Sequence, residues 1–392
     1  MTFTLTTFVI PTKWCFTGVL ALMLAACGGD TVTAVPAPLP APAQNVVTLL
    51  ASMTGDQELP PTVTGALGTG TLSLETSSLR LSGNFTLNGI SATDGHIHLG
   101  AAGANGPIAV PMTTANGETF TVPANTVLTA AQAEAFAGGG LYFNAHTPEN
   151  PSGEVRGQIG REVFAAQLSN AQEVPANASG AAGNGLINLD PVTKKISARI
   201  ALTGITATAA HIHTGILGAN GPVLFDLRET ASGSGIWINA VDVVLSDAQI
   251  TTLKAGGLYF NAHSAAFPGG EIRGQIGLNA RFARISAAQE VPANASSATG
   301  TGTLVVDPLT RAASGGLTAT GLTITAAHIH LGATGVNGPV IIPLVSTSTG
   351  VFSVPANTVF TADQFKAYKQ GNLYYNVHSV AFPGGEIRGQ IR

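Results

Sequence analysis

The chain has 392 residues, a formal net charge of −4 and only 10% charged residues, well under the usual quarter. Because contacts with nucleic-acid phosphates need clustered lysine and arginine, this charge balance argues against a nucleic-acid partner. Hydrophobic residues make up 45% of the chain, so its composition is not that of a disordered protein. No phosphate-binding GxxxxGK[ST] loop, GxSxG elbow or dinucleotide fingerprint occurs in it.

The first 26 residues have the pattern of a secretion signal. Lys13 precedes an apolar run from Trp14 to Ala26, which is shorter than the roughly twenty residues that a bilayer requires. The run ends in LAAC at residues 24–27, which resembles the bacterial lipoprotein signal. That resemblance implies acylation of Cys27, which becomes the first mature residue; the alternative is an ordinary signal peptide that ends near a cysteine.

Residues 27–43 are rich in proline and alanine, so we expect a semi-extended tether without a core. With Cys27 acylated, the membrane is one expected partner of the protein. Gly28 directly after the cysteine is similar to lipoproteins that are exported to the outer membrane. We therefore expect a lipid-anchored protein of the bacterial cell envelope.

One sequence pattern then recurs three times. His-x-His begins at His96, His211 and His328, at spacings of 115 and 117 residues. A period of that length matches a whole domain rather than a solenoid repeat. We therefore predict three tandem domains, at residues 44–160, 161–277 and 278–392.

Each repeat shows the same order of elements. Runs with alternating polarity and glycine-rich turns predict several short strands, and an Asn-Gly turn follows His-x-His. A capping box predicts one short helix per repeat, starting at Thr129, Ser246 and Thr361. The expected fold class is therefore mainly β, with tandem antiparallel β-sandwich or barrel domains that each carry one short helix.

These motifs together resemble the chordin-type (CHRD) domain. The resemblance rests on HxHxGxxGxNGP, Y[FY]NxH and GExRGQ, and it covers essentially the whole mature chain, once per repeat. It implies an extracellular β-domain, which in animals is part of proteins that bind growth factors. The first repeat departs from the others in the loop after residue 146, where it has TPENPSG.

All histidines of the chain fall within these motifs, three per repeat. Residues i and i+2 of a strand share a face, so the two histidines of each His-x-His lie side by side. An HxH pair with one more histidine is a common zinc or copper ligand set that leaves one coordination position open. The candidate ligands are His96, His98, His146, His211, His213, His263, His328, His330 and His378.

Other polar residues of the motifs share faces with these histidines and could orient them. They are Asn144, Glu154, Arg156, Asn261, Glu271, Arg273, Asn376, Glu386 and Arg388. Alternatively, the histidines form a structural hydrogen-bond network, and Glu154 with Arg156 is a surface ion pair.

The sequence thus favours a non-catalytic binding protein of the envelope, whose partner is an unidentified protein or envelope polymer. The second hypothesis is a zinc- or copper-binding protein with one three-histidine site per repeat. The third is a structural spacer.

Overall fold

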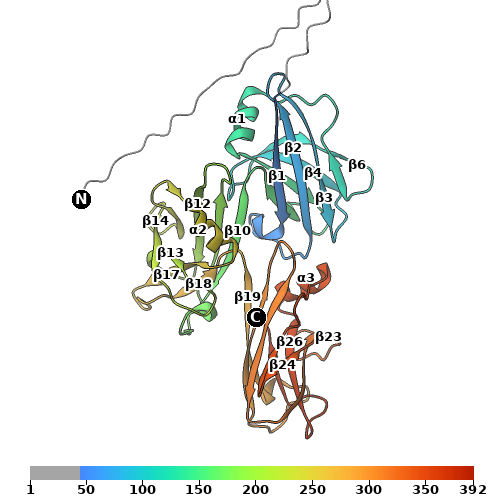
Figure 1. The fold of residues 1–392 in the computed structure, drawn as a ribbon, viewed down its shortest axis with the longest axis vertical. Coiled ribbons are helices and arrows are strands. Elements are labelled where there is room, and N and C mark those ends of the chain that lie inside the picture. The colour runs from blue at the N-terminus through green and yellow to red at the C-terminus, as the bar shows by residue number, and fades with distance from the viewer. Residues whose placement is uncertain (1–44) are drawn as a thin grey trace, which may run out of the picture. The chain divides into compact units, whose positions relative to one another are not determined.

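The computed structural model describes residues 45–392, in which each predicted repeat forms its own antiparallel sheet. We call the repeats module 1 (45–160), module 2 (161–277) and module 3 (278–392); Figure 1 colours them in this order from blue to red. The predicted signal peptide, Cys27 and the tether lie outside the described residues. No helix of residues 45–392 is both long enough and apolar enough to cross a membrane.

The three modules repeat one order of strands and helices. Module 1 contains β1 Val46–Thr54, β2 Leu67–Glu75, β3 Arg80–Asn88, β4 Asp94–Leu99, β5 Ile108–Pro111, β6 Thr113–Thr114, β7 Thr119–Thr121, α1 Ala130–Gly138, β8 Leu141–His146 and β9 Val155–Gln158. Module 2 contains β10 Glu162–Ser169, β11 Ala182–Leu189, β12 Lys195–Thr203, β13 Ala207–Thr214, β14 Val223–Glu229, β15 Ile236–Asn239, β16 Val243–Val244, α2 Asp247–Lys254, β17 Leu258–Ser264 and β18 Ile272–Gln275. Module 3 contains β19 Asn279–Ser286, β20 Thr299–Val306, β21 Ala313–Thr320, β22 Ile324–Leu331, β23 Val340–Pro343, β24 Val345–Ser348, β25 Val351–Ser353, α3 Ala362–Gln370, β26 Leu373–Ser379 and β27 Ile387–Gln390. A short 3-10 helix follows the first strand of each module: η1 Gly55–Gln57, η2 Asn170–Gln172 and η3 Ala287–Gln289.

The sheets are barrel-like, which decides between the two predicted architectures. In module 2 the strand order closes into a ring, because β11 pairs with both β10 and β12. In modules 1 and 3 the two ends of the strand order are consecutive segments of chain, β5–β6 and β23–β24. Module 2 has one strand, β14, where modules 1 and 3 have two. Pro111 and Pro343 end the first of those two strands, because proline has no N–H group to donate to the neighbouring strand.

Each barrel encloses its own hydrophobic core, built from the inward positions of alternating strands. Ile97, Ile212 and Ile329, the central residues of the three HxH motifs, are fully buried in these cores. The histidines on either side of them therefore point to the outer face of the barrel wall.

The predicted capping boxes are present in all three helices, with both reciprocal hydrogen bonds formed. Phe136, Leu253 and Phe365 on these helices are buried in the cores. The left-handed residue that ends α1 is Gly139. Trp237 is buried in the core of module 2.

Candidate metal site

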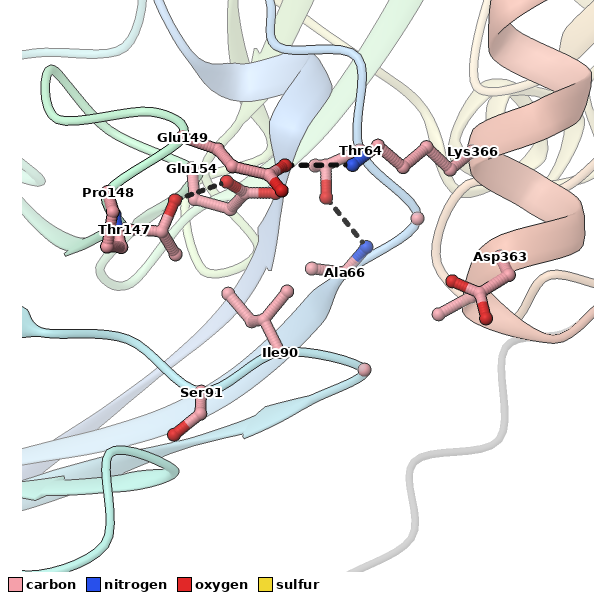
Figure 2. Close-up of a pocket in the computed structure, with 13 residues that line it drawn as sticks. Thr64, Ala66, Ile90, Ser91, Thr147, Pro148, Glu149, Glu154, Asp363 and Lys366 are labelled. Atoms are coloured by element: carbon pink, nitrogen blue, oxygen red, sulfur yellow. Dashed lines mark hydrogen bonds and ion pairs between the residues drawn. The ribbon is translucent and has the colours of Figure 1, made fainter.

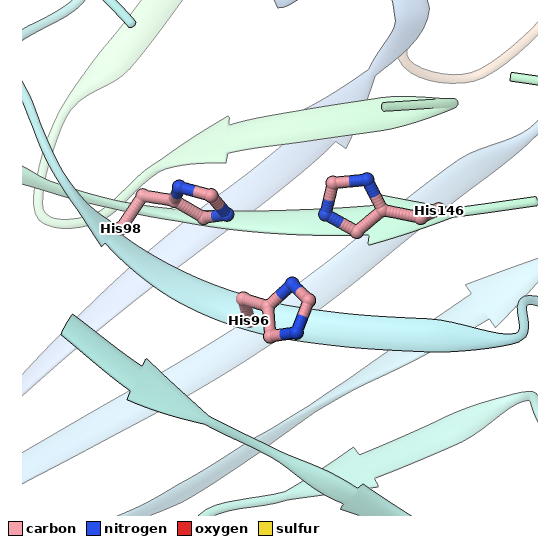
Figure 3. Close-up of side chains that lie close together, drawn as sticks. All are labelled: His96, His98 and His146. Atoms are coloured by element: carbon pink, nitrogen blue, oxygen red, sulfur yellow. The ribbon is translucent and has the colours of Figure 1, made fainter. Parts of the chain in front are cut away.

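Two neighbouring strands bring the three predicted histidines of module 1 together. His96 and His98 lie on β4, and β4 pairs with β8, which carries His146. One ring nitrogen from each histidine lies within 4.8 Å of the others, and Figure 3 shows the three rings gathered on one face. The same grouping occurs for His211, His213 and His263, and for His328, His330 and His378. We call these groups the three-histidine sites.

Backbone carbonyls hold two of the three rings in each module. His98 Nδ1 lies 2.9 Å from the Gly106 carbonyl, and His146 Nδ1 lies 3.1 Å from that of Pro151. Because a carbonyl only accepts hydrogen bonds, each Nδ1 carries the proton, and each Nε2 keeps a free lone pair. The buried His98 Nε2 and His146 Nε2, and also His96 Nδ1, have no hydrogen-bond partner.

Modules 2 and 3 repeat this arrangement with one additional contact. The carbonyls of Gly221 and Pro268 hold His213 and His263, and those of Gly338 and Pro383 hold His330 and His378. In addition, His211 Nδ1 lies 3.1 Å from His263 Nε2, and His328 Nδ1 lies 3.1 Å from His378 Nε2. The two nitrogens of each pair are close enough to share one proton or to bind one ion.

Burial favours the neutral, ligating form of these histidines. Desolvation, together with neighbouring imidazoles, lowers the pKa of His96, His98 and His146 below the usual value of 6.5. The same cause lowers the pKa of His213, His263, His328 and His330. At neutral pH these seven rings are therefore uncharged, the form that binds a metal ion.

A stack of three planar groups stands behind one ligand of each site. In module 1 the Tyr142 ring lies parallel to His98 at a centroid distance of 5.0 Å, and the Arg156 guanidinium carbon is 3.5 Å from the Tyr142 ring centroid. Arg156 also donates to the Ala101 carbonyl at 2.8 Å, in the loop that supplies the Gly106 carbonyl. Tyr259 with Arg273, and Tyr374 with Arg388, repeat the stack.

The arginine and the glutamate that the sequence predicted to orient the histidines form no hydrogen bond with the imidazole rings. Arg156 contacts His98 through Tyr142. Glu154 accepts a hydrogen bond from Thr147 at 2.7 Å (Figure 2) and another from Asn150. Glu271 and Glu386 accept from Ser179 and Ser296 instead. Arg156 and Glu154 are 1% and 3% exposed, so the alternative of a surface ion pair is wrong.

A buried glutamate stands next to the predicted asparagine of each module. Glu58, in the segment Gln57–Glu58–Leu59–Pro60, is only 5% exposed. Burial raises the pKa of Glu58 to about 8, against the opposing effect of Arg156, and raises that of Glu173 to about 7. Burial also raises the pKa of Glu290.

One oxygen of this glutamate and one of the neighbouring asparagine lack a hydrogen-bond partner in all three modules. The pairs are Glu58 Oε1 with Asn144 Oδ1, Glu173 Oε1 with Asn261 Oδ1, and Glu290 Oε1 with Asn376 Oδ1. A Cβ on Gly153 would lie 2.6 Å from Glu58 Oε1 and 2.8 Å from Asn144 Oδ1, so these oxygens lie against the same glycine. One proton on Glu58 would supply the donor that both oxygens lack.

Tyr142 and Glu58 belong to the surroundings of the site, although neither is among the candidate residues named from the sequence. The signal was present, since both residues recur in all three repeats, as Tyr259 and Tyr374 and as Glu173 and Glu290. Some aromatic core positions change between repeats: Phe143 is replaced by Tyr375 in the third. Exact recurrence of a polar or aromatic side chain separates such positions from ordinary packing.

The arrangement can hold one transition-metal ion per module. Three neutral imidazole nitrogens converge, with carbonyls fixing two of the rings, which is how proteins usually orient metal-binding histidines. A fourth coordination position remains for water or another ligand. Among residues 45–392 each group consists of histidines alone, so nitrogen is the ligand type that it supplies.

Comparison with known proteins agrees with the repeats. The family model of the CHRD domain matches residues 49–159, 164–276 and 282–391. No curated protein matched the chain.

Proposed function

Because the chain belongs to the CHRD domain family, in three tandem copies, we propose that each copy binds one zinc or copper ion through its three histidines. We further propose that the protein is an extracytoplasmic lipoprotein held at the membrane by acylated Cys27. The observation that carries the metal proposal is the convergence of three ligand nitrogens within 4.8 Å in every module. The LAAC motif and the tether composition support the anchoring.

The free nitrogens favour metal binding over a closed hydrogen-bond network. A structural network would leave the buried imidazole nitrogens paired, because an unpaired buried polar atom is costly. His98 Nε2, His213 Nε2 and His330 Nε2 have no partner in the protein. An ion at each site would satisfy all three in the same way.

The first test is the metal content of the mature protein, residues 28–392, after titration with zinc or copper and dialysis. We expect about three equivalents per chain, and their loss in the His98→Gln, His213→Gln, His330→Gln variant. Bound zinc also stabilises the fold by about 2.7 kcal/mol at a hundred times its dissociation constant, seen as a higher Tm. A wild-type protein that retains no metal and melts unchanged would contradict the proposal.

A matched control places glutamine at the next residue of each strand, in the variant Leu99→Gln, Thr214→Gln, Leu331→Gln. This protein keeps all nine histidines and should keep three equivalents of metal. For copper, electron paramagnetic resonance should show coupling to three nitrogen nuclei in the wild type.

A non-catalytic role in binding an envelope partner stays a prediction beside the metal sites. Three similar modules on one tether would favour a repetitive partner through effective concentration. The triple His→Gln variant separates the roles, since a partner that needs only the fold would still bind it.

A further inference from the structure

The three-histidine sites differ at one position of the neighbouring strand. The residue paired with the first histidine of each HxH is Pro111 opposite His96 and Pro343 opposite His328, but Asp226 opposite His211. Only module 2 therefore places a carboxylate there. Asp226 Oδ1 lies 3.7 Å from His211 Nε2, the ring nitrogen on the far side of the site.

His211 Nδ1 faces the other two histidines and Nε2 faces Asp226, so metal binding through Nδ1 would require the ring proton of His211 to sit on Nε2. Without metal, His263 Nδ1 faces the Pro268 carbonyl, so His263 Nε2 is an acceptor and His211 Nδ1 is its donor. To ligate a metal, His211 Nδ1 must give up this proton, and the neutral ring then carries its proton on Nε2. In module 2 the Asp226 carboxylate lies 3.7 Å from this nitrogen, close enough for a rotation of the Asp226 side chain to bring it within hydrogen-bond distance, whereas the residue paired with His328 in module 3 is Pro343, which offers no side-chain acceptor.

We propose that Asp226 is a positioning residue that makes the module 2 site bind a divalent metal ion more tightly than the module 3 site. This inference rests on the proposed metal-binding function. Asp226 acts by accepting the Nε2–H of His211 in the metal-bound tautomer and by adding one negative charge near the ion. Removing such carboxylate partners typically lowers metal affinity 10- to 100-fold. The Asp226 side chain is 79% exposed, so we expect about tenfold, the lower end of that range.

Module 3 is the appropriate reference for module 2. Its site has the same histidine contacts, and Ala326 lies opposite His378 as Ala209 lies opposite His263. Module 1 has a different carboxylate, Asp94, opposite His146, and this charge would also affect the metal affinity of its site. Module 1 is therefore not a suitable reference.

The test compares two full-chain proteins that each retain one intact site. His98→Gln with His330→Gln leaves module 2, and His98→Gln with His213→Gln leaves module 3. Zinc affinity is measured for both by competition with a chelator. We expect the module 2 protein to bind about tenfold more tightly, Asp226→Asn to remove that difference, and Pro343→Asp to raise the affinity of module 3. Pro343→Asn is the matched control, since it restores the backbone N–H without the charge.

A second readout follows the tautomer directly. In the zinc-loaded module 2 protein, nitrogen-15 spectra of the histidine rings should show His211 protonated at Nε2 and ligated through Nδ1. Equal zinc affinities of the two proteins, or an unchanged affinity in Asp226→Asn, would overturn the role of Asp226 while leaving the three-histidine sites in place. Absence of zinc binding in both proteins would overturn the proposed function itself, and this inference with it.

Discussion

At the scale of single residues, the buried pair of Glu58 and Asn144 makes stability depend on pH. The Glu58 carboxyl has a pKa of about 8 in the folded chain and about 4.3 when unfolded, so the folded state holds the proton between these values. Its stabilising contribution is complete below about pH 4 and is lost as the pH rises through about 8. Glu173 and Glu290 repeat the effect.

Replacing all three of these glutamates by glutamine should therefore flatten the pH dependence of stability. Glutamine keeps one donor and one acceptor, as the protonated acid does, but does not titrate. We expect the wild-type Tm to fall between pH 6 and 9 by clearly more than that of the Glu58→Gln, Glu173→Gln, Glu290→Gln protein. Parallel Tm curves for the two proteins would show that the carboxyls are already ionised at pH 6.

The glycine beside this pair tolerates no side chain. Gly153 has φ +141°, and an added Cβ would approach the Glu58 and Asn144 oxygens within 3 Å. Gly153→Ala should destabilise module 1 by about 1–3 kcal/mol in chemical denaturation, since both the backbone and the contact are strained. Gly138→Ala is the control, because its Cβ meets nothing within 4 Å and alanine in a helix should be neutral or stabilising by up to about 1 kcal/mol. Equal effects of the two substitutions would contradict this account.

At the scale of elements, the short helices depend on their caps. The Thr129 hydroxyl accepts from the Gln132 N–H and the Gln132 side chain accepts from the Thr129 N–H, so both partners of the box are satisfied. Thr129→Ala should cost about 1 kcal/mol of stability, whereas Thr129→Ser keeps the acceptor and should cost little. A denaturation midpoint that moves equally for both substitutions would mean that the lost methyl group, not the cap, is responsible.

The strand pair that carries the histidines could be anticipated only in part. Alternation along HxH placed the two histidines on one face, and the YxNxH pattern placed a third on a strand of its own. The spacing of the motifs did not predict that β4 and β8 are neighbours. Three strands, β5 to β7, and the helix α1 lie between them along the chain. Strand pairing over such separations is a property of the closed barrel.

At the scale of the whole molecule, all three sites should release their metal on mild acidification, the tighter module 2 site at a slightly lower pH than the module 3 site. The lowered pKa values of His98, His213 and His330 keep these three rings neutral at pH 7, so zinc retention should be constant from pH 8 to 7. Below about pH 6 protons compete for three nitrogens per site, and retention after dialysis should fall steeply. Rebinding of about three equivalents on return to pH 7 is the control for an intact fold. Full retention at pH 5 would mean that the histidines are not the ligands.

Much of this protein follows from its sequence alone. The threefold period, the mainly β class, the capped helices and the nine candidate histidines are all local or periodic signals, and local patterns depend on neighbours a few residues away. Only the tertiary structure showed the features that depend on segments far apart in the chain. These are the closure of the barrel, the positions of the Gly106 and Pro151 carbonyls that hold the histidine rings, and the burial of Glu58 beside Asn144. It also placed Asp226 next to His211, because strand register, which no short pattern encodes, determines which side chains meet across a sheet.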